Sequence, residues 1–345
     1  MSFKRVALGI DFSEPSLSAA RWTARHLVPD AELTLVHVVP NTAPPGFLGS
    51  ERGTAGRVLH GAREATAQGL RGLANSLDAM RCITTVRVGD VTEQLVEAAV
   101  EVEADLIVVG RTGRRGGRGL GTTADRLSRR APLPVLLAAR TLHAAPRNIL
   151  AALDESEIGL DVLRWTRRLG LQCDASITAL HVVRDELGDY FDAAGAAVKA
   201  ACAGAKDEIR AGTMDGASSA QDDDQRGAPG VSASAHAWLR TRLRAAGIDA
   251  TREASAVTIG DPRHEVLVAA DCFDAEIIVV GRHGVDADDG SGIGSVARAV
   301  LRPSTRSVLV VPPVRRGPAP PDPRRPRPPL AIVRSTPVAP RLRAR

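Results

Sequence analysis

The sequence predicts a Rossmann-like α/β fold in which a doubly wound parallel sheet is built twice in tandem. Continuous aliphatic runs such as "ADLIVVG" alternate with helical segments, a pattern typical of parallel strands that crossover helices bury on both faces. Long stretches of the first half recur in the second. Residues 314–345 are rich in Pro and Arg without helical or strand periodicity, which predicts an extended, disordered tail.

The elements of the first half follow from these apolar runs and the polar residues between them. Strands are expected at 5–10, 32–38, 83–88, 105–110 and 134–138, and helices at 14–27, about 57–79, 91–103 and 122–130. Asp90 and Asp261 each follow a glycine and open "DVTEQL" and "DPRHEV". We expect both to cap helices, because a carboxylate accepts the free N–H groups of a first turn. The strands at 134–138 and 307–311 are short and apolar, so their edges invite pairing.

The duplication is quantitative. "RVALGIDFSEPSLSAARWTARHL" (5–27) corresponds to "NILAALDESEIGLDVLRWTRRLG" (148–170). Asp11 maps to Asp154 and Trp22 to Trp165 at an offset of 143, His37 to His181 at 144, Gly89 to Gly260, Gly110 to Gly281 and Gly113 to Gly284 at 171, and Gly121 to Gly294 at 173. Such constancy indicates a tandem repeat of one supersecondary arrangement.

The change of offset from 144 to 171 places a 27-residue insertion between His181 and Gly260. Part of it, about 212–234, is small and polar and is expected to be disordered. The sequence therefore divides into a first domain at 1–142, a second domain at 146–313 containing that insertion, and the tail at 314–345.

Composition and charge argue against a cysteine-based metal site, a membrane protein or a nucleic-acid-binding protein. The tail holds nine arginines and one acid, so the formal charge of +5 belongs to the tail and not to the folded body. The four scattered cysteines have no metal-ligand or redox spacing, which indicates inert thiols. The chain shows no signal peptide and no run of 18 apolar residues, so a cytoplasmic protein without a membrane partner is expected. Basic "RRGGRG" and "PRRPRPP" lack aromatic residues that would stack bases, so nucleic acid is not an expected partner.

The stretch "GRHGVDADDGSGIGS" (281–295) carries the clearest chemical signal. It follows a buried strand, opens a helix, and has the spacing Gly-x2-Gly-x9-Gly-Ser. The first two glycines can adopt positive φ and turn backbone N–H groups inward. The free N–H groups and dipole of the following helix favour an anion. Ligands of open α/β sheets bind beyond the carboxyl ends of the strands, so the loop suits phosphate.

Taken together, the tandem halves, "GIDFS", "LTLVHVV", "VRVGD" and this glycine loop resemble the universal stress protein family in its two-domain form. The resemblance covers about 4–139 and 147–312. It implies two five-stranded domains of the adenine nucleotide alpha-hydrolase-like type, with the last strands of the two halves paired. Many members of the family bind ATP and others bind no nucleotide.

The resemblance implies site residues in each half. Adenine and ribose are expected beside the aspartate that follows the first strand and the valine that follows the histidine of the second strand, and the phosphates beside the glycine loop. These residues are Asp11, Val38, Gly110, Gly113, Gly121, Thr122 and Thr123 in the first half, and Asp154, Val182, Gly281, Gly284, Gly294, Ser295 and Val296 in the second. The aspartate could accept a ribose hydroxyl or hold the loop that follows the first strand.

The two loops depart from the ideal in opposite ways. The first, "GRTGRRGGRGLGTT", has only seven residues between its second and third glycines, but its arginines at 111, 114, 115 and 118 would attract phosphate. The second has nine, but carries Asp286, Asp288 and Asp289. These carboxylates would oppose a triphosphate unless Mg²⁺ accompanied it, or they face solvent. Spacing favours the second half and charge favours the first.

The expected function is therefore an ATP-binding regulatory protein of the stress response. The alternative is a tandem scaffold that binds no nucleotide and acts through protein contacts; homodimerisation and unidentified protein partners are compatible with either. The chain has no GxxxxGK[ST] loop and no nucleophile–base pair, so it is at most a slow ATPase. His37 and His181 lie within apolar strands and are expected to be hydrogen-bonded core residues.

Overall fold

A computed structural model describes residues 3–27, 31–40, 54–77, 81–113, 119–184, 229–248, 254–284 and 292–313. The first half contains β1 (Arg5–Gly9), α1 (Glu14–Trp22), a π-helical turn η1 (Thr23–Leu27), β2 (Glu32–Pro40), α2 (Thr54–Ser76), β3 (Arg81–Gly89), α3 (Val91–Glu101), β4 (Leu106–Gly110), α4 (Thr122–Arg130) and β5 (Val135–Ala138). The second half contains β6 (Asn148–Leu153), α5 (Ile158–Cys173), β7 (Ser176–Val183), α7 (Pro229–Ala245), β8 (Ala254–Ile259), α8 (Pro262–Cys272), β9 (Ile277–Gly281), α9 (Ser295–Leu301) and β10 (Ser307–Val311).

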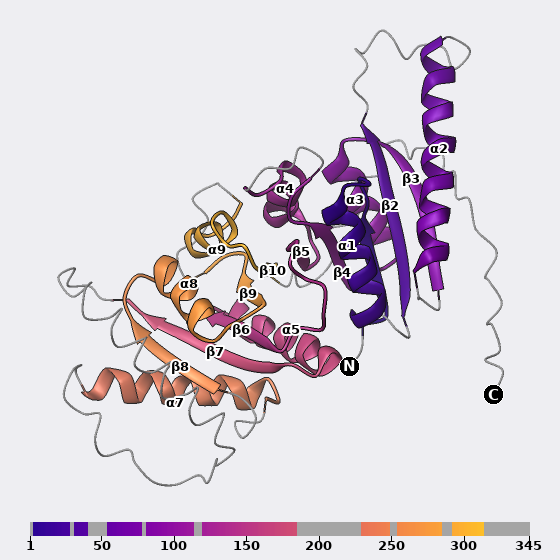
Figure 1. Ribbon diagram of the computed structural model, residues 1–345. Coiled ribbons are helices and arrows are strands. Elements are labelled where there is room, and N and C mark those ends of the chain that lie inside the picture. Colours follow the sequence, from indigo (N-terminus) through magenta and orange to yellow (C-terminus); the bar gives the residue numbers. More distant parts are fainter. Residues whose placement is uncertain are drawn as a thin grey trace, which may run out of the picture.

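All ten strands join one sheet in the order β3-β2-β1-β4-β5-β10-β9-β6-β7-β8 (Figure 1). Strand pairs within each half are parallel. The predicted pair of five-stranded, doubly wound sheets is confirmed. The chain runs from β1 outward to β2 and β3, then returns to form β4 on the other side of β1. This reversal creates a switch point between β1 and β4, and another between β6 and β9.

Helices cover both faces of the sheet. Side chains of α1, α2, α5 and α7 pack into one hydrophobic core, and those of α3, α4, α8 and α9 pack into the other. Successive strand residues alternate between these cores: Val6 and Leu8 enter the first, and Ala7 enters the second. Burial on both faces explains why the strands read as unbroken aliphatic runs.

The two halves meet along an antiparallel pair, in which Leu136 of β5 is opposite Leu309 of β10. Both strands are buried throughout, so the predicted pairing of the two edges is confirmed. We call this junction the seam. The halves also meet where the Arg168 guanidinium stacks on Phe3, 4.3 Å from the ring centroid, and donates to Asp105 at 3.0 Å.

Several predicted boundaries differ from those observed; the helix expected at 14–27 is α-helical only to Trp22, and the strand expected at 83–88 spans Arg81–Gly89. Helix α2 begins at Thr54, three residues earlier than expected. Helix α7 begins at Pro229, inside the range 212–234 predicted as disordered. Proline suits the first helical position because its missing N–H has no partner there in any case. The rest of that range and the predicted tail lie outside the described residues. In the part that the structure describes, no helix is long and apolar enough to cross a membrane.

The predicted helix caps are confirmed. Asp90 accepts the N–H groups of Thr92 and Glu93 at 2.9 and 3.1 Å, and Asp261 accepts that of Arg263 at 2.9 Å. Burial raises the pKa of the Cys82 and Cys173 thiols to about 12, which disfavours the reactive thiolate form.

Replacing Asp261 with alanine is expected to lower the free energy of unfolding by about 1 kcal/mol at neutral pH, the usual cost of a lost N-cap. The side-chain hydrogen bond from Arg263 holds the pKa of Asp261 below its usual value. This stabilisation is therefore present above the ordinary carboxyl pKa and is lost as pH falls through the lowered value. Urea unfolding of both chains at several pH values should show a difference that shrinks in acid; a constant difference would contradict the charged contribution.

Candidate functional site

The first candidate site lies at the switch point between β1 and β4, where the crevice of a doubly wound sheet receives ligands. Register joins Gly9 of β1 to Val109 of β4, so the residues that follow these two strands meet. Oδ1 of Asp11 accepts the backbone N–H and hydroxyl of Ser13 at 2.9 and 2.5 Å. Oδ2 lies toward the glycine loop, since a Cβ added at Gly113 would be 3.4 Å from it.

The second half repeats this arrangement between β6 and β9. Oδ1 of Asp154 accepts the N–H of Ser156 at 3.2 Å and also its hydroxyl. Oδ2 lies closer to the loop than in the first half, because a Cβ at Gly284 would be only 2.3 Å away. In both halves one carboxylate oxygen holds the loop after the first strand, and the other points toward the glycine loop.

The first two glycines of each loop serve close packing and not positive φ, whereas Gly292, later in the second loop, has a φ of 72°. None of Gly110, Gly113, Gly281 and Gly284 has a positive φ, contrary to the conformation considered from the sequence. A Cβ at Gly110 would lie 3.0 Å from the backbone of Pro15, and one at Gly281 would lie 2.6 Å from the Ile158 side chain. The missing side chains therefore let the helix after the first strand approach the end of the fourth.

The helices that follow the two loops begin without a side-chain cap. Gly121 and Gly294 are the N-cap residues of α4 and α9, and neither helix has a side-chain cap hydrogen bond. By contrast Ser13, Asp90 and Asp261 cap α1, α3 and α8. The predicted phosphate residues Thr122, Thr123, Ser295 and Val296 form these uncapped first turns.

The histidines are held as expected for core residues. Nδ1 of His37 donates to the Ile10 carbonyl at 2.7 Å, and Nδ1 of His181 donates to the Leu153 carbonyl at 3.1 Å. Each bond ties the end of the second strand to the end of the first.

The valines that follow the histidines are both buried near the ends of the first strands. Val38 and Val182 are buried, at 7 and 9% exposed, and their side chains lie in the hydrophobic core. The β1–β2 register ends at Val36, which accepts a hydrogen bond from Ile10. Alternate residues of a strand direct their backbone groups to the same side, so Val38 faces the space beyond the end of β1.

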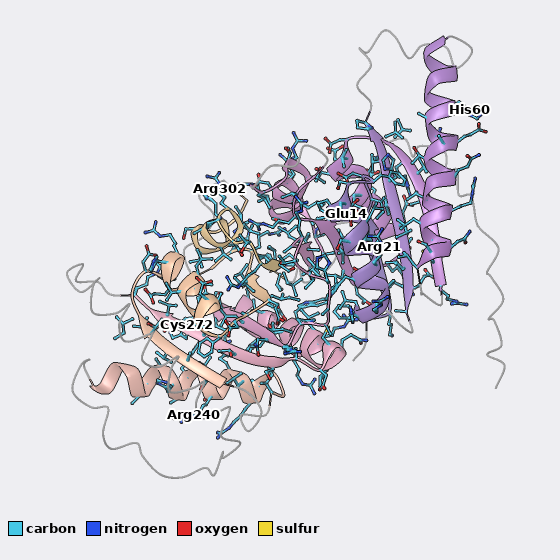
Figure 2. All side chains as sticks on the ribbon, viewed as in Figure 1. Glu14, Arg21, His60, Arg240, Cys272 and Arg302 are labelled. Carbon is cyan, nitrogen blue, oxygen red and sulfur yellow. The ribbon has the colours of Figure 1, made fainter. Side chains whose placement is uncertain are left out.

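The Arg111 side chain points away from the glycine loop, contrary to the expectation from the sequence. Its side chain is 4% exposed and crosses the seam, donating from Nη2 to the Leu301 carbonyl at 2.5 Å and to that of Arg302 at 3.1 Å. Arg302 is labelled in Figure 2 at the end of α9. Carbonyl groups at a helix C-terminus attract a cation, which explains the destination of the guanidinium. The remaining loop arginines (114, 115 and 118) and Asp286, Asp288 and Asp289 lie outside the described residues.

Two residues at the sites were missed from the sequence. Arg282 donates to the Ala131 carbonyl across the seam at 2.7 Å, and the repeated "VVGR" could have revealed that it matches Arg111. Phe12, beside Asp11, has φ of 60° and is 37% exposed, with its ring 5.2 Å from that of His37. No sequence signal marks Phe12, since positive φ is unusual for a bulky residue.

The contacts of Gly284 with Asp154 and of Gly113 with Asp11 predict that replacing each glycine with alanine will change stability by different amounts. Gly284→Ala is expected to lower the free energy of unfolding by about 1–3 kcal/mol, because the added Cβ must displace the Asp154 carboxylate or the loop. Gly113→Ala is the matched control and is expected to change it by less than about 0.5 kcal/mol, since 3.4 Å is ordinary contact. Urea unfolding measures both; equal effects would contradict the difference between the two sites.

Among the described residues, no group of three or more His, Cys, Asp or Glu side chains could hold a metal ion.

Comparison with known proteins identifies the family. The family model described as "Universal stress protein family" matches residues 2–139 and 146–312. A universal stress protein from Archaeoglobus fulgidus has a similar fold, with a TM-score of 0.56, 16% identity, and coverage of 89% of this chain and 98% of that one. A functionally unknown protein from Pseudomonas aeruginosa gives a TM-score of 0.56 at 15% identity, covering 90% of this chain and 93% of the other. No curated protein matches the chain. Because the family model spans most of the chain in two segments, the chain belongs to the universal stress protein family, in a tandem form.

Proposed function

We propose that this chain is a cytoplasmic regulatory protein of the stress response that binds ATP at the switch point of one or both halves. The observation that carries the proposal is the pair of glycine-capped helices, α4 and α9, whose first turns have no side-chain cap. Four backbone N–H groups at the start of a helix need partners from outside it. Phosphate oxygens satisfy such groups and also interact favourably with the helix dipole.

The neighbouring groups supply chemistry for the rest of a nucleotide. Oδ2 of Asp11 or Asp154, on the side of the glycine loop, can accept a ribose hydroxyl while Oδ1 keeps its bonds to the serine two residues later. The backbone of Val38, facing the space beyond β1, can pair with the edge of an adenine ring. A nucleotide in this pose would bring its phosphates to Gly121 or Gly294.

The negative charge of the aspartate at each switch point favours binding of the nucleotide together with Mg²⁺. The aspartate at each switch point is an anion near the proposed phosphate position, and its repulsion in a partly wet site would be on the order of 1–4 kcal/mol. Mg²⁺ takes carboxylate and phosphate oxygens together and prefers to be bound with phosphates. We therefore expect Mg-ATP to bind more tightly than ATP in the presence of a chelator.

The test is to purify the full chain, release any co-purified nucleotide with acid, and identify it by mass. A ratio near one or two ATP molecules per chain would support the proposal and count the competent halves. The chain is then titrated with Mg-ATP to about 1 mM by calorimetry. Absence of both co-purified nucleotide and titratable binding would overturn the proposal and favour the scaffold alternative.

A further inference from the structure

Arg111 and Arg282 occupy equivalent positions, directly after β4 and β9, and each holds its own glycine loop through its backbone. The carbonyl of Arg111 accepts the N–H of Gly121 at 2.9 Å, and that of Arg282 accepts the N–H of Gly294 at 2.7 Å. Their N–H groups donate to the last strand of the same half, at 2.8 and 2.7 Å. The last glycine of each loop, where the phosphate-facing helix begins, is thus fixed to the sheet through one arginine.

The side chains of the same two arginines reach into the other half. The Arg111 guanidinium bonds the carbonyls at the end of α9, and the Arg282 guanidinium bonds the carbonyl of Ala131, directly after α4. Helices α4 and α9 lie on either side of the seam in Figure 1. Each arginine therefore links its own loop to the helix that begins at the other loop.

Stability alone does not account for this arrangement. Arg111 is almost fully buried, burial lowers its pKa, and its Nη1 has no hydrogen-bond partner among the described residues. A buried cation with carbonyls as its bonded partners loses much of its hydration, and apolar side chains often replace buried charges without loss. The seam is already joined by β5–β10 pairing and by the stacking of Arg168 on Phe3.

The helices between the two contacts are short. Helix α9 runs only from Ser295 to Leu301, so the residue that opens it at the second loop is six positions from the carbonyl held by Arg111. Helix α4 similarly connects Thr122 to the residue before Ala131. Hydrogen-bonded α-helices of two turns move as units, so a displacement at one end is transmitted to the other.

We propose that Arg111 and Arg282 are positioning residues that couple the two glycine loops across the seam, so that a nucleotide at one loop raises the affinity of the other. The coupling rests on the proposed nucleotide binding. We expect the coupling to be positive because binding orders the chain. A ligand that fixes one loop also fixes the helix that begins there. The end of that helix holds the arginine of the other loop, and this arginine in turn holds the last glycine of its own loop. The second ligand then binds to a loop that is already partly ordered, so its binding costs less conformational entropy. We expect a coupling of about 5- to 20-fold, within the usual range for allosteric pairs.

The first test titrates the full chain with Mg-ATP by calorimetry. The parent chain should bind its second ATP about 5- to 20-fold more tightly than independent sites would. The Arg111→Met/Arg282→Met chain should bind two ATP molecules independently, and Arg111→Lys, which keeps a cationic donor, should retain part of the coupling. Arg5→Met is the matched control, because Arg5 donates to the Val102 carbonyl directly after α3 at 3.0 Å without crossing the seam. Two independent sites in the parent chain would overturn the coupling and leave nucleotide binding intact.

The second test needs no nucleotide and measures amide hydrogen exchange of the two loops. Arg111→Met should speed exchange at the N–H of Gly294, which it does not contact, as well as at Gly121; Arg5→Met should change neither. An effect confined to Gly121 would show a local role only and overturn the coupling. If one loop alone binds ATP, binding should slow exchange in the empty loop, and unchanged exchange there would also overturn it. If neither loop binds ATP, the proposed function fails, while the exchange result still decides whether the loops are linked.

Discussion

Replacing Gly294 with valine is expected to abolish ATP binding at the second loop up to about 1 mM, a loss of at least 100-fold for a micromolar site. A Cβ at this position would lie 3.3 Å from the Arg282 carbonyl oxygen and 3.4 Å from the Cα of His283. The branched methyl groups of valine would push the start of α9 away from the end of β9. Valine is also a poor N-cap residue. If the second half is competent, calorimetric titration of the variant should show one ATP molecule fewer than the parent chain; an unchanged stoichiometry would assign the site to the first half alone.

Gly121→Val makes the corresponding change in the first loop, where a Cβ would lie 3.3 Å from the Arg111 carbonyl oxygen. The two single variants identify the competent half or halves, and the double variant should bind no ATP. Gly119→Val is the matched control within the first loop, because nothing lies within 4 Å of a Cβ there. Loss of binding in Gly119→Val, or full binding in the double variant, would contradict the assigned role of the last glycine.

Leu136→Ala should cause the largest loss of stability, about 2–5 kcal/mol. Leu136 is 0% exposed and lies at the seam, between Val108 of β4 and Leu309 of β10. The truncated side chain would leave a cavity where the two halves share their core, and close-packed strands on both sides limit its collapse. Urea unfolding of the full chain, followed by circular dichroism, measures the change in unfolding free energy.

The control for this substitution is Leu171→Ala, which removes the same atoms from a side chain that is 62% exposed on α5. Its expected cost is below about 0.5 kcal/mol, as for surface changes away from packing features. Similar losses in both variants would show that the core at the seam contributes no more than an exposed leucine. A new unfolding transition in Leu136→Ala alone would indicate that the halves have become independent.

Local patterns predicted the elements that carry strong, regular signals. Helix α4 spans Thr122–Arg130, as the sequence predicts. The prediction was possible because a glycine N-cap precedes the helix and an apolar strand follows it. The helix caps Asp90 and Asp261 could likewise be predicted, because each carboxylate accepts N–H groups only two or three residues later in the sequence. The polar composition of 212–234 predicts disorder, whereas α7 begins within this range at Pro229, because proline can open a helix.

The sequence by itself determined the duplication and the doubly wound class, because both follow from periodicity and from spacing along the chain, and the family resemblance implied the candidate residues of each switch point. Only the tertiary structure decided where the buried arginines go. The place of Arg111 in a glycine loop predicts that it attracts phosphate, whereas its guanidinium bonds the end of a helix about 190 residues later in the chain. A partner so distant leaves no local pattern, and the antiparallel meeting of β5 and β10 is what brings the two together.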